Sequence, residues 1–209
     1  MSAGATSLLR GLRPDLALVA SMITEGSRVL DIGCEDGALL EALVKEKNVI
    51  GRGLELSQSG VNASVRRGLS VVQGDADRDL EHYPDHSFDV VVLSQTLPAT
   101  RSPDKVLAEL VRIGRCVIVS FANFGYWRVR LHLLWRGQMP VTPALSKPWY
   151  ATDNIHLCTI RDFLTLTDRL DIEVEQAIAL NAHSRPRPIV SKRYANLFGE
   201  VGLFLLTKR

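Results

Sequence analysis

Three acidic residues and two glycines lie at positions that suit the binding of a nucleoside ligand. Asp31 lies where a short apolar run ends, and Gly33 and Gly37 follow in the loop Asp-Ile-Gly-Cys-Glu-Asp-Gly. Glu55 ends the next apolar run, and Asp75 lies in an acidic turn after the third. An acid after the second strand can accept hydrogen bonds from both ribose hydroxyls, and the later turn offers an acceptor for an adenine amino group. The spacing predicts a site for an adenosine-containing ligand.

A fourth strand end adds Ser94 to this pattern, and four pieces at four strand ends are more specific than one glycine loop. For Asp75 and its neighbour Asp77, a plainer role as turn and cap residues stays open. The chain has neither Gly-x-Gly-x-x-Gly nor Gly-x-x-x-x-Gly-Lys, so the spacing favours S-adenosylmethionine over a dinucleotide or a triphosphate. The predicted ligand-binding residues are Asp31, Gly33, Cys34, Glu35, Gly37, Glu55, Leu56, Asp75, Ala76 and Ser94.

Alternating strand and helix patterns predict the elements that position these residues. Continuous apolar runs such as Phe88–Leu93 are typical of strands covered on both faces. Pro14 suits the first turn of a helix, and Ser57 suits an N-cap. This β-α alternation is typical of an α/β fold with a mostly parallel sheet. Strands are predicted at 29–32, 49–56, 70–73, 88–93, 116–121, 172–180 and 200–207, and helices at 13–23, 38–44, 57–65, 104–113, 124–136 and 159–170.

Two stretches interrupt the alternation. Residues 137–158 form a long connection with three prolines, and connections of that length inside a compact domain are often lids or binding loops. We therefore predict one domain over 1–209, with a lid-like insertion at 137–158. Residues 181–196 are polar and basic, and a solvated loop is expected there, with an anion site as the alternative.

Aromatic side chains gather near the predicted lid, where they form either a roof over a small substrate or a surface for a protein partner. At least half of them are expected to pack in the core. Methyl transfer needs mainly proximity and an in-line approach, with a base only where the nucleophile is protonated. Asn123, Tyr150 and His156 are the available polar candidates, and the catalytic residues stay unknown. The aromatic residues are Tyr126, Trp127, Trp135, Trp149 and Tyr150.

Composition limits the possible partners and compartment. The 209 residues are 46% hydrophobic and 23% charged, with a formal net charge of +2, so neither a nucleic-acid nor a membrane partner is expected. Three distant cysteines argue against a disulfide framework or a zinc site and favour a reducing cytoplasm. The N-terminal residues do not resemble a signal peptide, and no apolar run approaches the roughly 18 residues that a membrane helix needs.

Six stretches match the motifs of one family, and the later of these motifs are distinctive of it. The sequence resembles the methionine-biosynthesis MetW family, a branch of the S-adenosylmethionine-dependent methyltransferase superfamily, from about residue 13 to 206. The resemblance implies a Rossmann-like class I methyltransferase fold with a seven-stranded sheet whose last strand is antiparallel. It also implies a role beside a homoserine O-acyltransferase, which such proteins are thought to assist in methionine synthesis. The matching stretches are Val29–Gly37, Leu54–Arg67, Gln73–Leu80, Phe88–Thr100, Ser120–Arg128 and Pro148–Thr159.

One residue departs from the family pattern in the glycine loop. The family usually has Gly-Cys-Gly-Asp-Gly, and Glu35 stands where the middle glycine is expected. A Cβ there crowds the ligand, and the backbone can need a positive φ that glycine adopts most easily. We expect Glu35 to weaken binding of S-adenosylmethionine or S-adenosylhomocysteine by about 1–3 kcal/mol, the scale of local backbone strain.

Two functions follow from these features. The first is a non-catalytic or weakly catalytic subunit that binds and activates a homoserine O-acyltransferase, as the family resemblance and Glu35 indicate. The alternative is an active small-molecule methyltransferase, which the retained Asp31, Glu55 and Asp75 favour. A third possibility joins them, with bound S-adenosylmethionine tuning the activity of the partner.

Overall fold

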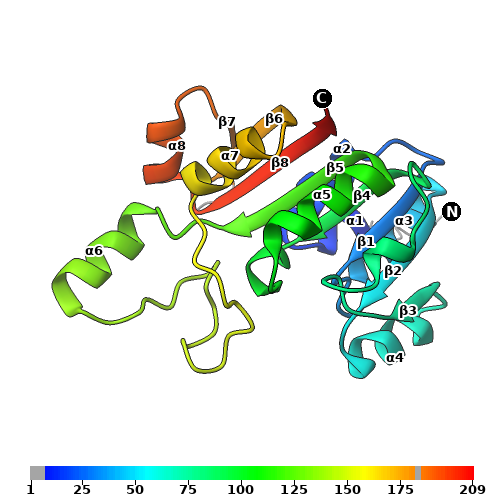
Figure 1. Ribbon diagram of the computed structural model, residues 1–209. Coiled ribbons are helices and arrows are strands. Elements are labelled where there is room, and N and C mark those ends of the chain that lie inside the picture. The colour runs from blue at the N-terminus through cyan, green and yellow to red at the C-terminus, as the bar shows by residue number, and fades with distance from the viewer. Residues whose placement is uncertain (1–7, 182–184) are drawn as a thin grey trace, which may run out of the picture.

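Figure 1 shows the computed structural model of the chain, which describes residues 8–181 and 185–209. Within these residues, eight strands form one sheet in the order β3-β2-β1-β4-β5-β8-β6-β7. The five strands from β3 to β5 are parallel, whereas β8 is antiparallel to both of its neighbours, β5 and β6. The strands are β1 Arg28–Ile32, β2 Ile50–Glu55, β3 Val71–Gln73, β4 Phe88–Ser94, β5 Gly114–Ala122, β6 Ile172–Leu180, β7 Pro186–Pro188 and β8 Val201–Lys208.

The expected architecture is confirmed, because the sheet is mostly parallel and its last strand is antiparallel. The described chain has one strand more than the expected seven, since β7 pairs with the outer edge of β6. In the described part of 181–196, β7 is followed by α8 (Lys192–Phe198), so the prediction of a solvated loop is wrong. Pro186 and Pro188 hide the strand in the sequence, but an edge strand tolerates proline because one side of it has no partner to bond.

Helices cover both faces of the sheet (Figure 1). Successive side chains of a strand point to opposite faces, so Val29 packs beside α2 and α3 while Leu30 packs beside α5 and α7. By the same alternation, Asp31 shares the face of Val29. The helices are α1 Leu8–Gly11, α2 Pro14–Met22, α3 Ala38–Lys47, α4 Gln58–Arg66, α5 Pro103–Ile113, α6 Trp127–Arg136 and α7 Ile160–Arg169, with 3₁₀ turns at Leu80–His82 and Leu97–Ala99.

Side-chain caps explain where two of these helices begin. Ser57 accepts a hydrogen bond from the N–H of Gly60 at 3.1 Å, which confirms Ser57 as the N-cap of α4. Thr159 and Asp162 form a reciprocal capping box at the start of α7. Behind that cap, Phe163 packs against Phe121 and Phe204, with ring centroids 5.0 and 4.5 Å away. The cap therefore anchors α7 over the centre of the larger apolar core.

Residues 137–158 contain no helix or strand and connect α6 to α7. In Figure 1, α6 extends away from the helices that cover the sheet, and the connecting segment returns from its far end toward α7. Only Val129 of α6 is buried. A lid function for this segment stays a prediction. Across the described residues, no helix is long and apolar enough to cross a bilayer.

Candidate functional site

A cleft of about 1200 Å³ opens where the loops after β1, β2 and β4 meet residues 139–157 of the long connection. This is the carboxyl-end edge of parallel strands, where open α/β sheets bind their ligands. Four of the predicted ligand-binding residues lie in its wall. They are Gly33, Glu35, Glu55 and Leu56.

Gly33 and Glu35 give the glycine loop its path along the cleft. Gly33 has φ +71°, and a Cβ at this position would lie 2.4 Å from Oγ1 of Thr96. Glu35 has φ +51°, in the left-handed region that glycine adopts at least cost. The backbone therefore follows the course expected of a glycine at position 35, although the residue there carries an exposed side chain.

Glu55 is already engaged by its own neighbourhood. Its Oε2 accepts the backbone N–H of Glu35 at 2.9 Å, and its Oε1 accepts the N–H and the hydroxyl of Ser57 at 2.9 and 2.8 Å. A carboxylate has about four acceptor positions, so three of those on Glu55 are in use. A ribose that binds here would compete with or share these bonds. The Glu35–Glu55 contact thus couples the loop after β1 to the acid at the end of β2.

Asp31 and Cys34 lie beneath the loop and are not among the cleft-lining residues of the described chain. Asp31 is only 3% exposed. Its burial, helped by the carboxylates of Glu35 and Glu55, raises the pKa of Asp31 to about 7. Burial likewise raises the pKa of the Cys34 thiol to about 12. A Cβ at Gly53 would lie 2.7 Å from Sγ of Cys34, so this protonated thiol packs tightly against β2.

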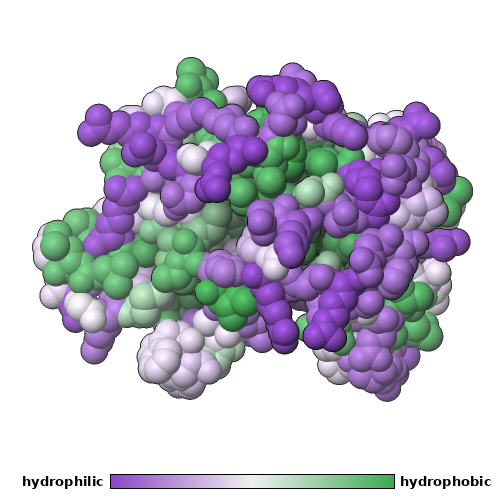
Figure 2. Space-filling view, in the orientation of Figure 1, coloured by the Kyte–Doolittle hydropathy of each residue, from purple (hydrophilic) through white to green (hydrophobic). Residues whose placement is uncertain are grey.

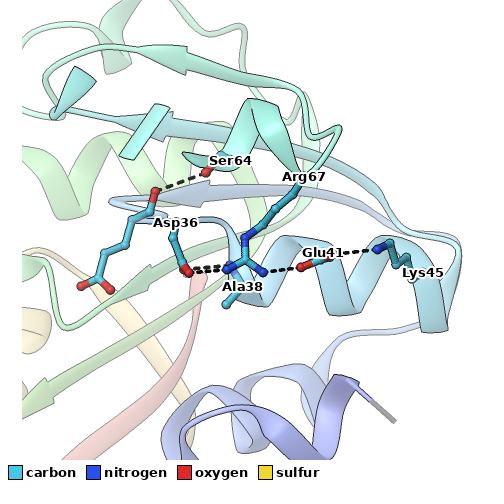
Figure 3. A network of polar contacts seen from close by, with 7 residues as sticks. Asp36, Ala38, Glu41, Lys45, Ser64 and Arg67 are labelled. Carbon is cyan, nitrogen blue, oxygen red and sulfur yellow. Dashed lines mark hydrogen bonds and ion pairs between the residues drawn. The ribbon is translucent and has the colours of Figure 1, made fainter. Parts of the chain in front are cut away.

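Gly37 belongs to a polar clamp that fastens the glycine loop to α4 rather than to the cleft wall. A Cβ on Gly37 would lie 2.8 Å from Oγ of Ser64, and this hydroxyl donates a hydrogen bond to the carbonyl of Glu35 at 3.2 Å. Arg67 forms ion pairs with both Asp36 and Glu41 (Figure 3). The first turn of α3 and the last turn of α4 therefore hold the loop from one side.

Asp75, Ala76 and Ser94 lie outside the cleft wall as the described residues define it. Oδ1 of Asp75 accepts the N–H of Asp77 at 2.9 Å, which is a local turn contact. Asp77 in turn accepts the N–H groups of Arg101 and Ser102, just before α5, at 2.8 and 2.9 Å. The plainer role as turn and cap residues therefore accounts for their present contacts. The Ser94 and Ser120 hydroxyls are hydrogen-bonded at 3.0 Å.

Several cleft residues are not among the ten predicted ligand-binding residues. Asp15 of α2 is buried and pairs with Arg13, with 3.4 Å between Arg13 Nε and Asp15 Oδ1. Gln95 has φ +59°, and its Nε2 lies 3.5 Å from Oδ2 of Asp15. Lys147 enters the wall from the long connection, and its pKa is raised mainly by Asp153, with a contribution from Glu35. These residues come from α2, the loop after β4 and the long connection, and only the tertiary structure brings these three segments together.

The three polar candidates for catalysis lie elsewhere. Asn123 is 1% exposed, and its amide bonds to backbone groups that include the carbonyl of Gly199 at 2.7 Å. Tyr150 and His156 are exposed and are not among the cleft-lining residues of the described chain. The Nε2 of His156 lies 3.4 Å from the carbonyl of Arg101. None of these side chains is placed as a base in the cleft.

The expected core packing of the aromatic residues is wrong for most of them. Tyr126 is buried, and Trp127 is half-buried beneath the guanidinium of Arg128, 5.4 Å from the ring centroid. Trp135, Trp149 and Tyr150 are exposed by 77%, 72% and 76%. The reason is that α6 and the long connection extend from the sheet instead of covering it (Figure 1).

Comparison with known proteins decides the family. The family model described as "Methionine biosynthesis protein MetW" matches residues 13–206. The chain belongs to the MetW family. Over 176 residues it is 32% identical to the "Bifunctional methionine biosynthesis protein MetXA/MetW" of Rhodopirellula baltica. That match covers 80% of this MetW chain but only 28% of the bifunctional protein.

Solved structures agree on the fold of this MetW protein. An S-adenosylmethionine-dependent methyltransferase of Thermotoga maritima, a possible histamine N-methyltransferase, matches 97% of this chain and 91% of its own with a TM-score of 0.69 and 17% identity. A second such methyltransferase, from Mesorhizobium loti, matches 95% and 99% with a TM-score of 0.68 and 17% identity. At this identity the likeness shows the fold alone. The MetW chain therefore has a class I methyltransferase fold.

Proposed function

We propose that this MetW protein is an accessory subunit that binds and activates a homoserine O-acyltransferase, and that its cleft holds S-adenosylmethionine or S-adenosylhomocysteine. The observation that carries the proposal is the bifunctional relative, whose name joins MetXA and MetW in one protein. Parts that are fused in one organism are held at high effective concentration. A MetW domain without such a fusion would reach the same arrangement by binding.

The cleft supports the ligand part of the proposal. Gly33 lets the loop pack directly against Thr96, and Glu35 adopts the left-handed backbone conformation expected of a glycine at its position. Glu55 presents its carboxylate at the end of β2, with a fourth acceptor position for a ribose hydroxyl. These residues fit an adenosyl ligand. When bound, S-adenosylmethionine would supply an activated methyl group, while the chain itself would bind and orient the nucleoside.

The position of the three predicted polar candidates supports an accessory role over methyl transfer to a protonated nucleophile. His156 and Tyr150 do not line the described cleft, and Asn123 is bonded within the fold. The cleft volume of about 1200 Å³ nevertheless favours a second candidate function, because ligand sites of about 300–1000 Å³ hold one small molecule. An active small-molecule methyltransferase would have room here for cofactor and acceptor together.

Two measurements test these functions. Co-purification with the homoserine O-acyltransferase of the same organism, followed by acylation assays with and without this chain, tests the accessory role. We expect a stable complex and a higher acylation rate, and no complex with no change in rate would overturn the proposal. Titration calorimetry with S-adenosylmethionine tests whether the cleft binds this ligand. If no heat of binding is detected at millimolar ligand, both the proposed ligand and the methyltransferase function are excluded.

A further inference from the structure

The most unusual surface of the molecule is an arm formed by residues 127–158, which comprise α6 and the long connection after it. In Figure 1 the arm projects from the end of the molecule opposite α4. A surface helix normally buries an apolar stripe against its own core, but only Val129 of α6 is buried. Leu133, Leu134 and Trp135, in the last turn of this helix, are exposed.

The arm exposes several large apolar side chains. Leu134 and Trp135 at the end of α6 are exposed by 76% and 77%, and Val141, Trp149 and Tyr150 follow at 60%, 72% and 76%. Figure 2 shows apolar side chains gathered over α6, at the left of the molecule. Contiguous exposed apolar patches mark interaction sites, and Trp and Tyr are common among the residues that dominate interface energy.

The charge of the arm narrows the choice of partner. Residues 127–158 contain four Lys and Arg residues and a single acidic residue, Asp153. Three arginines lie on α6 itself, among them Arg136 at its exposed end. Two copies of the chain that met arm to arm would bring these like charges together, which disfavours a symmetric dimer through this surface. A partner with an apolar patch and an acidic rim is complementary to it.

We propose that the arm is the surface on which the homoserine O-acyltransferase docks, through an apolar patch rimmed by acidic residues. This inference rests on the proposed accessory function and names its interface. Trp135 and Leu134 enter the apolar patch, and Arg136 faces the acidic rim. Met139, Trp149 and Leu157 of the arm also line the cleft, so a partner seated here reaches the mouth of the ligand site.

Binding assays with matched variants test the arm. We would measure the Kd of the purified acyltransferase for the wild-type chain and for Trp135→Ala, Leu134→Ala and Arg136→Glu. Val65→Ala and Arg66→Glu on α4 are the controls, because they repeat an apolar and a charge change on an exposed helix at the other end of the molecule. Melting curves should stay within a few degrees of wild type, since the altered arm side chains are exposed.

The expected result is a Kd at least tenfold higher for Trp135→Ala and severalfold higher for Arg136→Glu, with both α4 variants within twofold of wild type. Arg136→Glu should also reduce the salt dependence of binding. If the wild-type chain binds the acyltransferase and all arm variants bind equally well, the arm is not the docking surface, while the accessory function stands. If the wild-type chain does not bind at all, the accessory function itself fails. Dimerisation of the wild-type chain that Trp135→Ala abolishes would assign the arm to a second copy and overturn the proposal.

Discussion

Glu35 is the residue that separates this chain from the usual pattern of its family, and its backbone and side chain have different consequences. Its backbone takes φ +51° and donates its N–H to Glu55 at 2.9 Å, so the loop keeps a glycine-like path. Its carboxylate lies in the cleft wall and contributes to the raised pKa of Asp31. The loop therefore tolerates the substitution, while the ligand site gains negative charge.

Replacing Glu35 separates these two effects. We expect Glu35→Gly to strengthen binding of S-adenosylhomocysteine by about 1–3 kcal/mol, because it removes a bulky and negatively charged side chain from the wall of the cleft. Glu35→Gln keeps the bulk but removes the charge, so it should recover only part of this gain. Titration calorimetry of the three proteins provides the comparison, and equal affinities would show that Glu35 does not control the site.

The buried carboxyl of Asp31 makes stability depend on pH. Its pKa is about 7 in the folded protein against an ordinary value of 3.8, and the largest cause is burial. The folded chain thus holds a proton that the unfolded chain releases between these two values. The contribution of Asp31 to stability is fully present below pH 3.8 and is lost as pH rises through about 7.

We expect Asp31→Asn to remove this pH dependence. Relative to the variant, the free energy of unfolding of the wild type should fall by up to about 1.4 kcal/mol per pH unit between pH 5 and 7 and then level off. Urea unfolding of both proteins at a series of pH values measures this difference. Parallel profiles for the two proteins would contradict a raised pKa at Asp31.

At the scale of elements, the start of α7 links local chemistry to the core. The Thr159–Asp162 capping box fixes the first turn, and Phe163 then enters the cluster with Phe121 and Phe204. α6 lies at the other extreme, because it has no side-chain cap and buries only Val129. The two helices flank the same connection, so residues 137–158 are anchored at the α7 end and begin at the projecting end of α6.

A cap substitution tests the anchored end. Thr159→Ala should lower the free energy of unfolding by about 1 kcal/mol, because the N–H of Asp162 loses its acceptor. Thr159→Ser retains the hydroxyl and should lose much less. Urea titration with tryptophan fluorescence and circular dichroism measures both variants, and an equal loss would assign the effect to the lost methyl group rather than to the cap.

At the scale of the whole molecule, the cleft and the arm share one segment of chain. Several residues between Met139 and Leu157, among them Trp149, line the cleft and belong to the proposed docking surface. Lys147 in this segment is influenced electrostatically by Glu35 across the cleft. A ligand that orders the segment would therefore change the surface that a partner meets, and the partner would change the affinity for the ligand.

Such coupling has to be reciprocal. If S-adenosylhomocysteine changes the affinity for the acyltransferase by some factor, the acyltransferase must change the affinity for S-adenosylhomocysteine by the same factor. We expect a factor between about 5 and 150, the usual range for coupled sites. Calorimetry of each binding step, with and without the other component, measures all four affinities. Equal affinities in all four states would mean that the cleft and the docking surface are independent.

Local patterns in the sequence were sufficient for most of the strands and helices along the chain and for the edge of the sheet that carries the cleft. Apolar runs such as Phe88–Leu93 identify buried strands because their side chains are covered on both faces. Gly33 and Glu55 follow successive strands of this kind, so parallel strand order brings them together. The family motifs are equally local, and the match over residues 13–206 confirms the resemblance.

Only the tertiary structure decided which of these side chains line the cleft and which form contacts within the protein interior. Asp75 and Ser94 follow the predicted strand ends but lie outside the cleft wall of the described chain, and Glu55 is bonded to Glu35 and Ser57. The exposure of Trp135 could not be predicted from the sequence either, because an aromatic residue can occur both in a core helix and in a helix that projects from the core. The physical reason is that burial, pKa and hydrogen-bond partners depend on residues that are distant in the chain and meet only on folding.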